Sequence, residues 1–541
     1  MHDSSVWKYK LAVLEKRISA FPQGYRQNLA LLGDSEEEIA YLLEEYLNEY
    51  VNRDVAVIHT DTRHIDQKDF FKSIAASILS EYLRKAESLD NLILEASPIL
   101  PSTTQYIKDV TKKNSVPGFI EALELVNKFI IESGRKCVFI IENFLGLRRL
   151  FPHFHHEFSK FIVIQRNCMV ILTSAYVKES EKFLATELNV LFGNFENVYL
   201  NEMSFVDNYV YLKQALAKHP CSPFFISFFV NILSSNTMYY DLVQRGIREH
   251  YRQDAEESSI VAMLYQALFV RQSYLFQKFI NKINFIENSC KDFYSLIKLL
   301  IALSNGYSRK QELASLHIVE SRELQVKLQK LCDMNFVDSV GDLYKVKDSL
   351  FSFWLSHVFA FTFFSPLRNP VKNRILFEKK AEETLVLFKE TFYKDKVKRV
   401  LELIASFKDD TLRFGRFKYK LPCVERTRIV SYPDRNFHLI VGEGKEIIFV
   451  GIKDSCTEDK DILDFLEQGS SVKGKGVRKI FISLDKVSSA VKLVAKNNKL
   501  PLWDIDEINR IMTVYNKPIL SCASHEHAFG NNPDLDHNDA T

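Results

Sequence analysis

The sequence predicts an α/β fold built on a parallel sheet, with helical and mixed α/β parts after it. The first observation is a set of five short, uninterrupted apolar runs in the first 200 or so residues, as in strands buried on both faces. Helical patterns between the runs, such as Asp69–Ala86 and Gly118–Ser133, are the second observation, because crossover helices make successive strands parallel. The runs are Asn28–Gly33, Asp54–Asp61, Cys137–Asn143, Cys168–Ala175 and Glu196–Met203.

Composition sets the limits of this prediction. The chain has 541 residues, of which 46% are hydrophobic, enough for several domains with buried cores. A net charge of +2 gives no overall attraction to nucleic acid or to an anionic membrane. The eight cysteines include no Cys-x-x-Cys pair, and the N-terminus is polar. Reduced thiols and a cytoplasmic location are therefore expected.

The second half of the chain divides by pattern into further parts. Residues 1–205 form the α/β domain, and 206–290 show only helical patterns. Residues 291–365 read as three helices followed by a hairpin at Gly341-Asp342, the order of a winged helix. A Lys-rich helical linker (366–423), a last α/β domain (424–520) and a disordered tail (521–541) follow.

One aromatic segment, Leu350–Leu367, has about the length of a membrane span. Polar side chains interrupt it, namely Ser352, Ser356, His357 and Thr362. We therefore predict a buried aromatic helix and no membrane span.

Gly33 ends the first apolar run and precedes a helix, which is where a phosphate-binding loop lies in a P-loop nucleotide-binding fold. In the pattern G-x-x-x-x-G-K-[ST], the second glycine, the lysine and the hydroxyl residue would fall on Glu38, Ile39 and Ala40. Only the first glycine is present, so the loop is degenerate.

The replacements in this stretch are acidic. Asp34 and Glu36–Glu38 would each repel a triphosphate by several kcal/mol per close pair at an effective dielectric of about 20. Ser35 and Glu38 match a capping box, and acids in a first turn stabilise a helix dipole. By itself, the stretch fits a lost phosphate loop and an ordinary capped helix equally well.

The ends of the next strands also lack residues that nucleotide hydrolysis requires. Nucleotide-hydrolysing folds of this type end the third strand with Asp-Glu, which hold magnesium and orient the attacking water. Here the third run ends in Glu142-Asn143, degenerate Walker B positions, since an asparagine cannot act as a base. The next run ends in Thr173-Ser174, at a sensor-like position.

The stretch "YKVKDSLFSFWL" (Tyr344–Leu355) carries a family resemblance. It is similar to the Tyr-x-hydrophobic-x-Asp-Pro-Leu-Phe-x-Phe-Trp signature of the archaeal-type ATPases, a branch of the AAA+/STAND P-loop ATPases, with Ser349 in place of the proline. Leu233–Leu242 resembles a weakened form of that family's lid motif. The resemblance spans roughly residues 15–365 and implies an AAA+-type P-loop NTPase-like sheet, a helical lid, a winged helix and a C-terminal restriction-endonuclease-like domain.

In that last domain the family's nuclease motif, Asp…Glu-x-Lys, would fall on His438, Gly451 and Lys453. Both acids are missing, so a two-carboxylate metal cage cannot form. The resemblance therefore implies two degenerate sites and no catalytic residue.

Two further clusters, both rich in histidine, are candidate metal sites. Zinc needs at least three converging ligands, and the spacing of His153, His155, His156 and Glu157 favours a polar helix start instead. The tail histidines His525, His527 and His537 form a weaker candidate. We predict no metal site.

Candidate DNA contacts on the predicted recognition helix are Arg322, Lys327 and Lys330, but neighbouring acids nearly cancel their charge. The last domain is an equal candidate for DNA binding. Its local basic residues are Arg426, Arg428, Lys473, Lys475, Arg478 and Lys479.

The sequence thus predicts a catalytically inactive ATPase-fold protein that acts as a scaffold or regulatory subunit of a protein or protein–nucleic acid assembly. Protein partners are expected, an active ATPase paralogue among them. One alternative is a DNA-binding protein that uses the winged helix and nuclease-like domain. The other is a divergent active ATPase, the only case with ATP and Mg²⁺ as cofactors, in which Arg148 or Arg149 would supply the missing cation.

Overall fold

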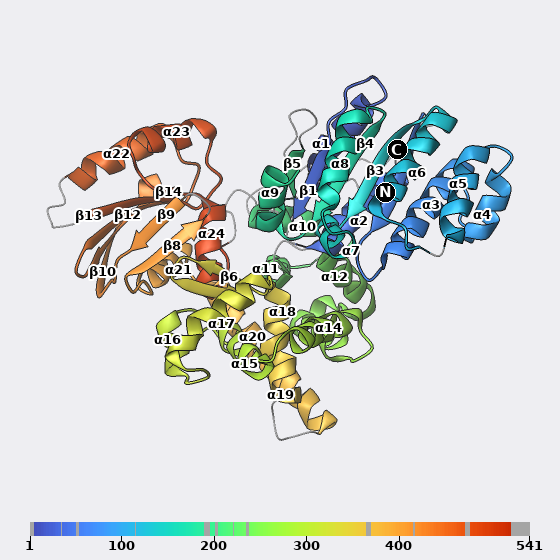
Figure 1. The fold of residues 1–541 in the computed structure, drawn as a ribbon. Coiled ribbons are helices and arrows are strands. Elements are labelled where there is room, and N and C mark those ends of the chain that lie inside the picture. The colour runs from blue at the N-terminus through green and yellow to red at the C-terminus, as the bar shows by residue number, and fades with distance from the viewer. Residues whose placement is uncertain are drawn as a thin grey trace, which may run out of the picture. The chain divides into compact units, whose positions relative to one another are not determined.

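The computed structural model divides into two compact units, residues 1–202 and 203–541, which are described separately (Figure 1). The described residues are 5–33, 35–49, 54–113, 115–188, 195–200, 204–219, 221–233, 237–363, 369–414, 417–470 and 477–520. The predicted disordered tail, 521–541, lies outside them.

The first unit contains a five-stranded, all-parallel sheet in the order β2-β3-β4-β1-β5. Each of the five predicted runs forms one of these strands, with ends shifted by a few residues at most. This confirms the α/β fold class and is consistent with a P-loop ATPase fold. The strands are β1 (Leu29–Gly33), β2 (Val55–Asp61), β3 (Lys136–Glu142), β4 (Cys168–Ser174) and β5 (Glu196–Leu200).

Helices cover both faces of this sheet, because alternate strand residues point to opposite sides. Ala30 and Leu32 belong to one core, and Leu29 and Leu31 belong to the other. The first core takes side chains from α3 (Gln67–Leu83), α4 (Leu89–Ala96), α5 (Pro101–Lys112), α6 (Phe119–Ser133), η1 (Phe144–Gly146), α7 (Leu147–Leu150), α8 (Phe154–Ile164) and α9 (Val177–Thr186). The second takes them from α1 (Ser5–Ala20) and α2 (Glu36–Glu49).

The second unit begins with helices, as the sequence predicts. They pack through one large aromatic core, to which α11 contributes four phenylalanines. The elements are α10 (Phe205–Ala215), α11 (Pro223–Leu233), α12 (Thr237–His250), η2 (Gln253–Ala255), α13 (Glu256–Leu264), η3 (Tyr265–Phe269) and α14 (Tyr274–Ser289).

Three helices and a hairpin follow in the predicted order. They are α15 (Phe293–Ser304), α16 (Lys310–Ser315), α17 (Ser321–Asp333), β6 (Val337–Val340) and β7 (Leu343–Val346). Gly341 turns the hairpin with a φ of +73°, and a Cβ atom there would lie 1.9 Å from the Thr411 carbonyl oxygen. Only glycine fits both the left-handed backbone and this close approach.

The aromatic segment is a broken helix, α18 (Ser349–Trp354), a π-turn η4 (Leu355–Phe359) and α19 (Ala360–Phe363). Trp354 is fully buried and donates its indole N–H to the Leu268 carbonyl at 3.0 Å. None of the described helices is long and apolar enough to cross a membrane.

The predicted helical linker is only partly helical. After α20 (Pro370–Phe392) and α21 (Lys396–Ile404), the chain forms an antiparallel hairpin of β8 (Asp410–Phe414) and β9 (Phe417–Leu421). The prediction missed this hairpin because its many lysines and arginines hide a short strand alternation in which Leu412 and Leu421 face the core.

The last part is a mixed sheet in the order β10-β11-β12-β13-β14. Its first three strands pair antiparallel and its last three pair parallel. The strands are β10 (Arg426–Tyr432), β11 (Phe437–Glu443), β12 (Ile447–Lys453), β13 (Val477–Ser483) and β14 (Leu502–Trp503), with η5 (Pro433–Arg435) between β10 and β11. Helices α22 (Asp459–Ser470) and α23 (Ser489–Asn497) pack on one face, whereas α21 and α24 (Ile505–Val514) pack on the other.

Candidate functional site

The candidate site of the first unit is the edge at which its parallel strands end, where open α/β sheets bind ligands. Helix α2 begins at Glu36, only three residues after the end of β1 at Gly33. The last five positions of the eight-residue phosphate-loop pattern are therefore already helical. Between Gly33 and this helix only Ser35 is described, so the described residues form no loop that could wrap around a phosphate.

The lysine position of that pattern faces the core. The Ile39 side chain is 2% exposed and belongs to the core formed by α1, α2 and the sheet. A Cβ atom on Gly33 would lie 3.3 Å from Ile39 Cγ1 and 3.3 Å from Leu200 Cβ. Ile39 thus packs over Gly33, and the half-buried Ala40 and Glu38 follow and precede it on the same helix.

The first turn of α2 uses protein groups where a nucleotide would place its phosphates. The Ser35 hydroxyl accepts a hydrogen bond from the Glu38 N–H at 3.3 Å, as the predicted cap requires. The Glu36 carboxylate lies 3.4 Å from the Arg63 guanidinium. Asp34 and the side chain of Glu37 lie outside the described part of the structure.

Sequence reasoning missed a polar cluster centred on Asp61, the last residue of β2. Asp61 accepts hydrogen bonds from the Arg63 Nε at 2.7 Å, the Arg63 N–H at 2.9 Å and the Asn143 Nδ2 at 3.0 Å. Burial raises the pKa of the Asp61 carboxyl, but these hydrogen bonds outweigh burial and the net pKa is lowered. The sequence feature that could have indicated this cluster is an acid at the end of a strand followed by an arginine two residues later.

The positions that the sequence predicts to correspond to Walker B, Glu142 and Asn143, belong to the same cluster. Glu142 ends β3, is 5% exposed, and its Oε1 lies 2.5 Å from the His59 Nε2. Asn143 has a left-handed backbone (φ +52°), and its N–H donates to the Thr173 hydroxyl at 3.2 Å. The strand ends therefore bond to one another.

The remaining sequence candidates at this edge are also engaged. The Ser174 hydroxyl accepts from the Tyr176 N–H at 3.0 Å. Arg148 pairs with Glu179 and Glu187 at 2.8 and 3.0 Å, and Arg149 donates to the Thr62 carbonyl at 3.0 Å. The cation paired with the first turn of α2 is Arg63, a residue that the sequence had not indicated.

The nuclease-motif positions of the second unit lie on neighbouring strands, β11 and β12. His438 bonds through Nδ1 to the Ser431 hydroxyl at 2.9 Å, and Lys453 Nζ lies 3.1 Å from Asp461 Oδ1. A Cβ atom on Gly451 would lie 2.7 Å from the Phe465 ring, so aromatic packing occupies the position of the second acid. This arrangement offers no carboxylate pair for a metal ion.

The DNA-contact candidates on α17 differ in exposure. The Arg322 side chain is 80% exposed and pairs with Glu320, whereas Lys327 is 12% exposed and lies near Asp292 and Glu323. Lys330 is 3.9 Å from Asp292.

In the last domain, Arg428 and Arg478 pair with Glu443 and Glu446. Lys473 and Lys475 lie outside the described residues.

The hairpin that would form the wing is docked within the second unit. The Asp342 N–H donates to the Thr411 carbonyl at 2.9 Å, and the Thr411 N–H donates to the Asp342 carboxylate at 2.8 Å. Nearby, Arg309 forms two 2.8 Å hydrogen bonds with the buried Asp410, which also accepts from the Tyr515 hydroxyl at 2.7 Å. The hairpin tip thus contacts β8, while Asp342 is also exposed to solvent.

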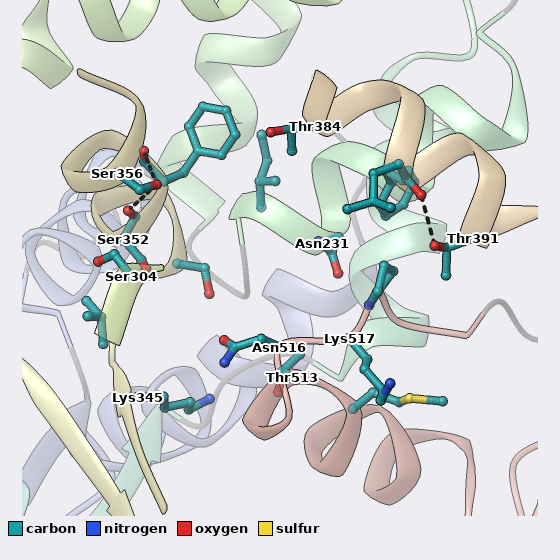
Figure 2. A pocket seen from close by; sticks show the side chains of 18 of the residues that line it. Asn231, Ser304, Lys345, Ser352, Ser356, Thr384, Thr391, Thr513, Asn516 and Lys517 are labelled. Atoms are coloured by element: carbon teal, nitrogen blue, oxygen red, sulfur yellow. Dashed lines mark hydrogen bonds between the residues drawn. The ribbon is translucent and has the colours of Figure 1, made fainter. Parts of the chain in front are cut away.

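A cavity with a volume of about 450 Å³ lies among α15, α18, α20 and α24 of the second unit (Figure 2). Its walls carry hydroxyl and amide groups, for example Ser304, Thr384 and Asn516. Two basic side chains, Lys345 and Lys517, also line it. The sequence could not indicate this cavity because its walls come from segments almost 290 residues apart.

No protein-family model and no curated protein sequence matches this chain. Among solved structures, the Walker-type ATPase of Pyrococcus abyssi is similar at 17% identity and a TM-score of 0.47, over 66% of this chain and 96% of that one. The Aeropyrum pernix ORC2 protein is similar at 8% identity and a TM-score of 0.38, over 70% and 94%. The Aeropyrum pernix ORC1 protein in complex with DNA gives 12% identity and a TM-score of 0.34, over 64% and 91%.

Proposed function

We propose that this chain is a catalytically inactive ATPase-fold protein that serves as a scaffold or regulatory subunit of a larger assembly. The observation that carries the proposal is Ile39. A nucleotide-binding loop needs a lysine there to reach the terminal phosphates, and this chain has a buried isoleucine packed over Gly33.

The electrostatics of the strand edge support the same proposal. Glu36 stands in the first turn of α2, and its neighbouring cation, Arg63, is held by Asp61. A triphosphate would have to take Arg63 from two carboxylates and would lie near Glu36 itself. Like charges at about 4 Å repel by about 4 kcal/mol at an effective dielectric of 20.

The direct test is titration of the full-length protein with ATP and Mg²⁺ by calorimetry, together with a hydrolysis assay. We expect no heat of binding at micromolar ATP and no phosphate release. Glu142→Gln serves as the matched variant and should behave like the wild type. Micromolar binding, or hydrolysis that Glu142→Gln abolishes, would establish a divergent active ATPase instead.

Helix α20 supports a role in binding another protein. It is buried along one face through residues such as Phe377 and Phe388, yet large apolar side chains stand exposed elsewhere on it. Exposed apolar groups gathered on one element are typical of protein-interaction surfaces. They are Val371, Ile375, Leu376, Val386 and Leu387.

The partner proposal can be tested by affinity capture from the native host. We expect a reproducible protein partner that the double variant Ile375→Glu/Leu387→Glu loses and that Lys379→Glu, an exposed change on the same helix, retains. Capture that is unchanged in the double variant would exclude this helix as the binding surface. A gel shift at low salt with duplex DNA would favour the DNA-binding alternative.

A further inference from the structure

Three histidines converge at the start of helix α8 in the first unit. His153 directly precedes the helix with a left-handed backbone (φ +64°), and His155 and His156 lie in its first turn. One ring nitrogen from each histidine lies within 4.8 Å of the other two. The sequence suggested only a polar helix start, because the turn at His153 that brings its ring back toward the others cannot be read from spacing.

A carboxylate from another element faces this cluster. The Glu187 Oε2 lies 3.5 Å from the His155 Nδ1, and Glu187 directly follows α9. Arg148 is close by, but it pairs with the other oxygen of Glu187 and with Glu179. Its positive charge is therefore offset by two carboxylates.

Three imidazoles and a carboxylate are a donor set that suits zinc and its neighbours among the transition metals. With Zn–N bonds of about 2.0–2.1 Å, ligand nitrogens in a tetrahedral site lie about 3.4 Å apart. The donor nitrogens of the three histidines already lie within 4.8 Å of one another, and the His153 and His156 side chains are exposed.

We propose that His153, His155, His156 and Glu187 form a binding site for a late first-row divalent cation such as Zn²⁺. A bound ion would join the first turn of α8 to the end of α9 on one face of the parallel sheet. Glu157, the acid that the sequence placed with these histidines, is a less suitable fourth ligand because it pairs with Lys160 at 3.3 Å. The site is independent of the proposed loss of ATPase chemistry.

The test uses full-length protein that has been treated with a chelator. Calorimetric titration with Zn²⁺ should show saturable binding of one equivalent at this site, and Co²⁺ should give the intense visible absorption of a four-coordinate ion. His155→Ala and His156→Ala should each weaken binding at least ten-fold, and Glu187→Gln should weaken it by a smaller factor. Circular dichroism without metal checks that each variant is folded.

Two controls separate this cluster from other histidines. His317→Ala, at a histidine of the second unit, should leave Zn²⁺ binding unchanged. A triple variant of the tail histidines His525, His527 and His537 to alanine should also retain the one-equivalent site. The proposal is overturned if no such site is found, or if the tail variant loses it while His155→Ala and His156→Ala keep it.

Discussion

The two sites that we propose to be degenerate are filled in different ways. At the strand edge of the first unit, polar groups bond to one another around Asp61, Arg63 and Asn143, above the buried Ile39. At the nuclease-motif positions of the second unit, the Phe465 ring occupies the space beside Gly451. The first site combines this polar cluster with the buried Ile39, whereas the second lies beside an aromatic core. In both sites, a substitution at a core position should therefore cost more stability than one at a partly exposed position.

The largest effect is expected for Gly451→Asp. A Cβ atom there would meet Phe465 at 2.7 Å and Phe481 at 3.2 Å, and the carboxylate would enter an apolar core. Overpacking and burial of an unpaired polar group together should cost about 3–5 kcal/mol in the free energy of unfolding. His438→Asp, at a half-buried position, should cost under about 1 kcal/mol. Urea unfolding of both variants measures the difference, and equal costs would contradict the comparison.

The next effect is expected for Ile39→Ala. Removing this buried side chain leaves a cavity over Gly33 and Leu200, and such truncations cost about 2–4 kcal/mol. The adjacent Ala40→Ser, which introduces the hydroxyl residue of the phosphate-loop pattern, should change stability by no more than about 1 kcal/mol. Thermal or urea unfolding checks both. A small loss of unfolding free energy for Ile39→Ala would mean that Ile39 does not pack tightly over Gly33 and Leu200.

Acid should weaken the second unit before the strand edge of the first. Burial lowers the pKa of His357 to about 3, and this side chain is 8% exposed. The unfolded chain, with a histidine pKa of about 6.5, binds the proton first, so this contribution to stability is present above pH 6.5 and is lost progressively as pH falls toward 3. At pH 5 the loss should be about 2 kcal/mol.

The matching measurement is urea unfolding at pH 7.5 and pH 5 for the wild type and for His357→Asn. Between pH 7.5 and pH 5, the free energy of unfolding should fall by about 2 kcal/mol less in the variant than in the wild type. By contrast, the lowered pKa of Asp61 means that its contribution is present above the ordinary carboxyl pKa and is lost only as pH falls from that value through the lowered pKa of the folded state. Equal pH dependence of wild type and variant would show that His357 is not buried in neutral form.

The smallest effect is expected for Asp61→Asn. The variant keeps the shape of the side chain but weakens the charge-assisted bonds from Arg63, which is partly exposed, so the cost should be about 1–2 kcal/mol. A double-mutant cycle with Arg63→Gln should recover a coupling of about 0.5–1 kcal/mol. Absence of any coupling would show that the pair does not hold the edge together.

Local patterns in the sequence predicted much of the fold. Continuous apolar runs indicated all five parallel strands, and the alternation around Gly341-Asp342 indicated the hairpin of β6 and β7. The short hairpin of β8 and β9 was missed, because lysine and arginine side chains fill its exposed positions. Strand periodicity is a reliable signal only where one face is clearly apolar.

By itself, the sequence determined which residue types stand at the positions of the two motifs: Ile39 where a phosphate loop has a lysine, Asn143 where a base would follow the third strand, and His438 and Gly451 where a nuclease motif has acids. Only the tertiary structure decided what stands in their place. Arg63 reaches Glu36, Phe465 covers Gly451, and Glu187 meets the histidines of α8, all through contacts between separate elements. The physical reason is that residue types fix which bonds a group can form, whereas chain topology fixes which partners come within reach.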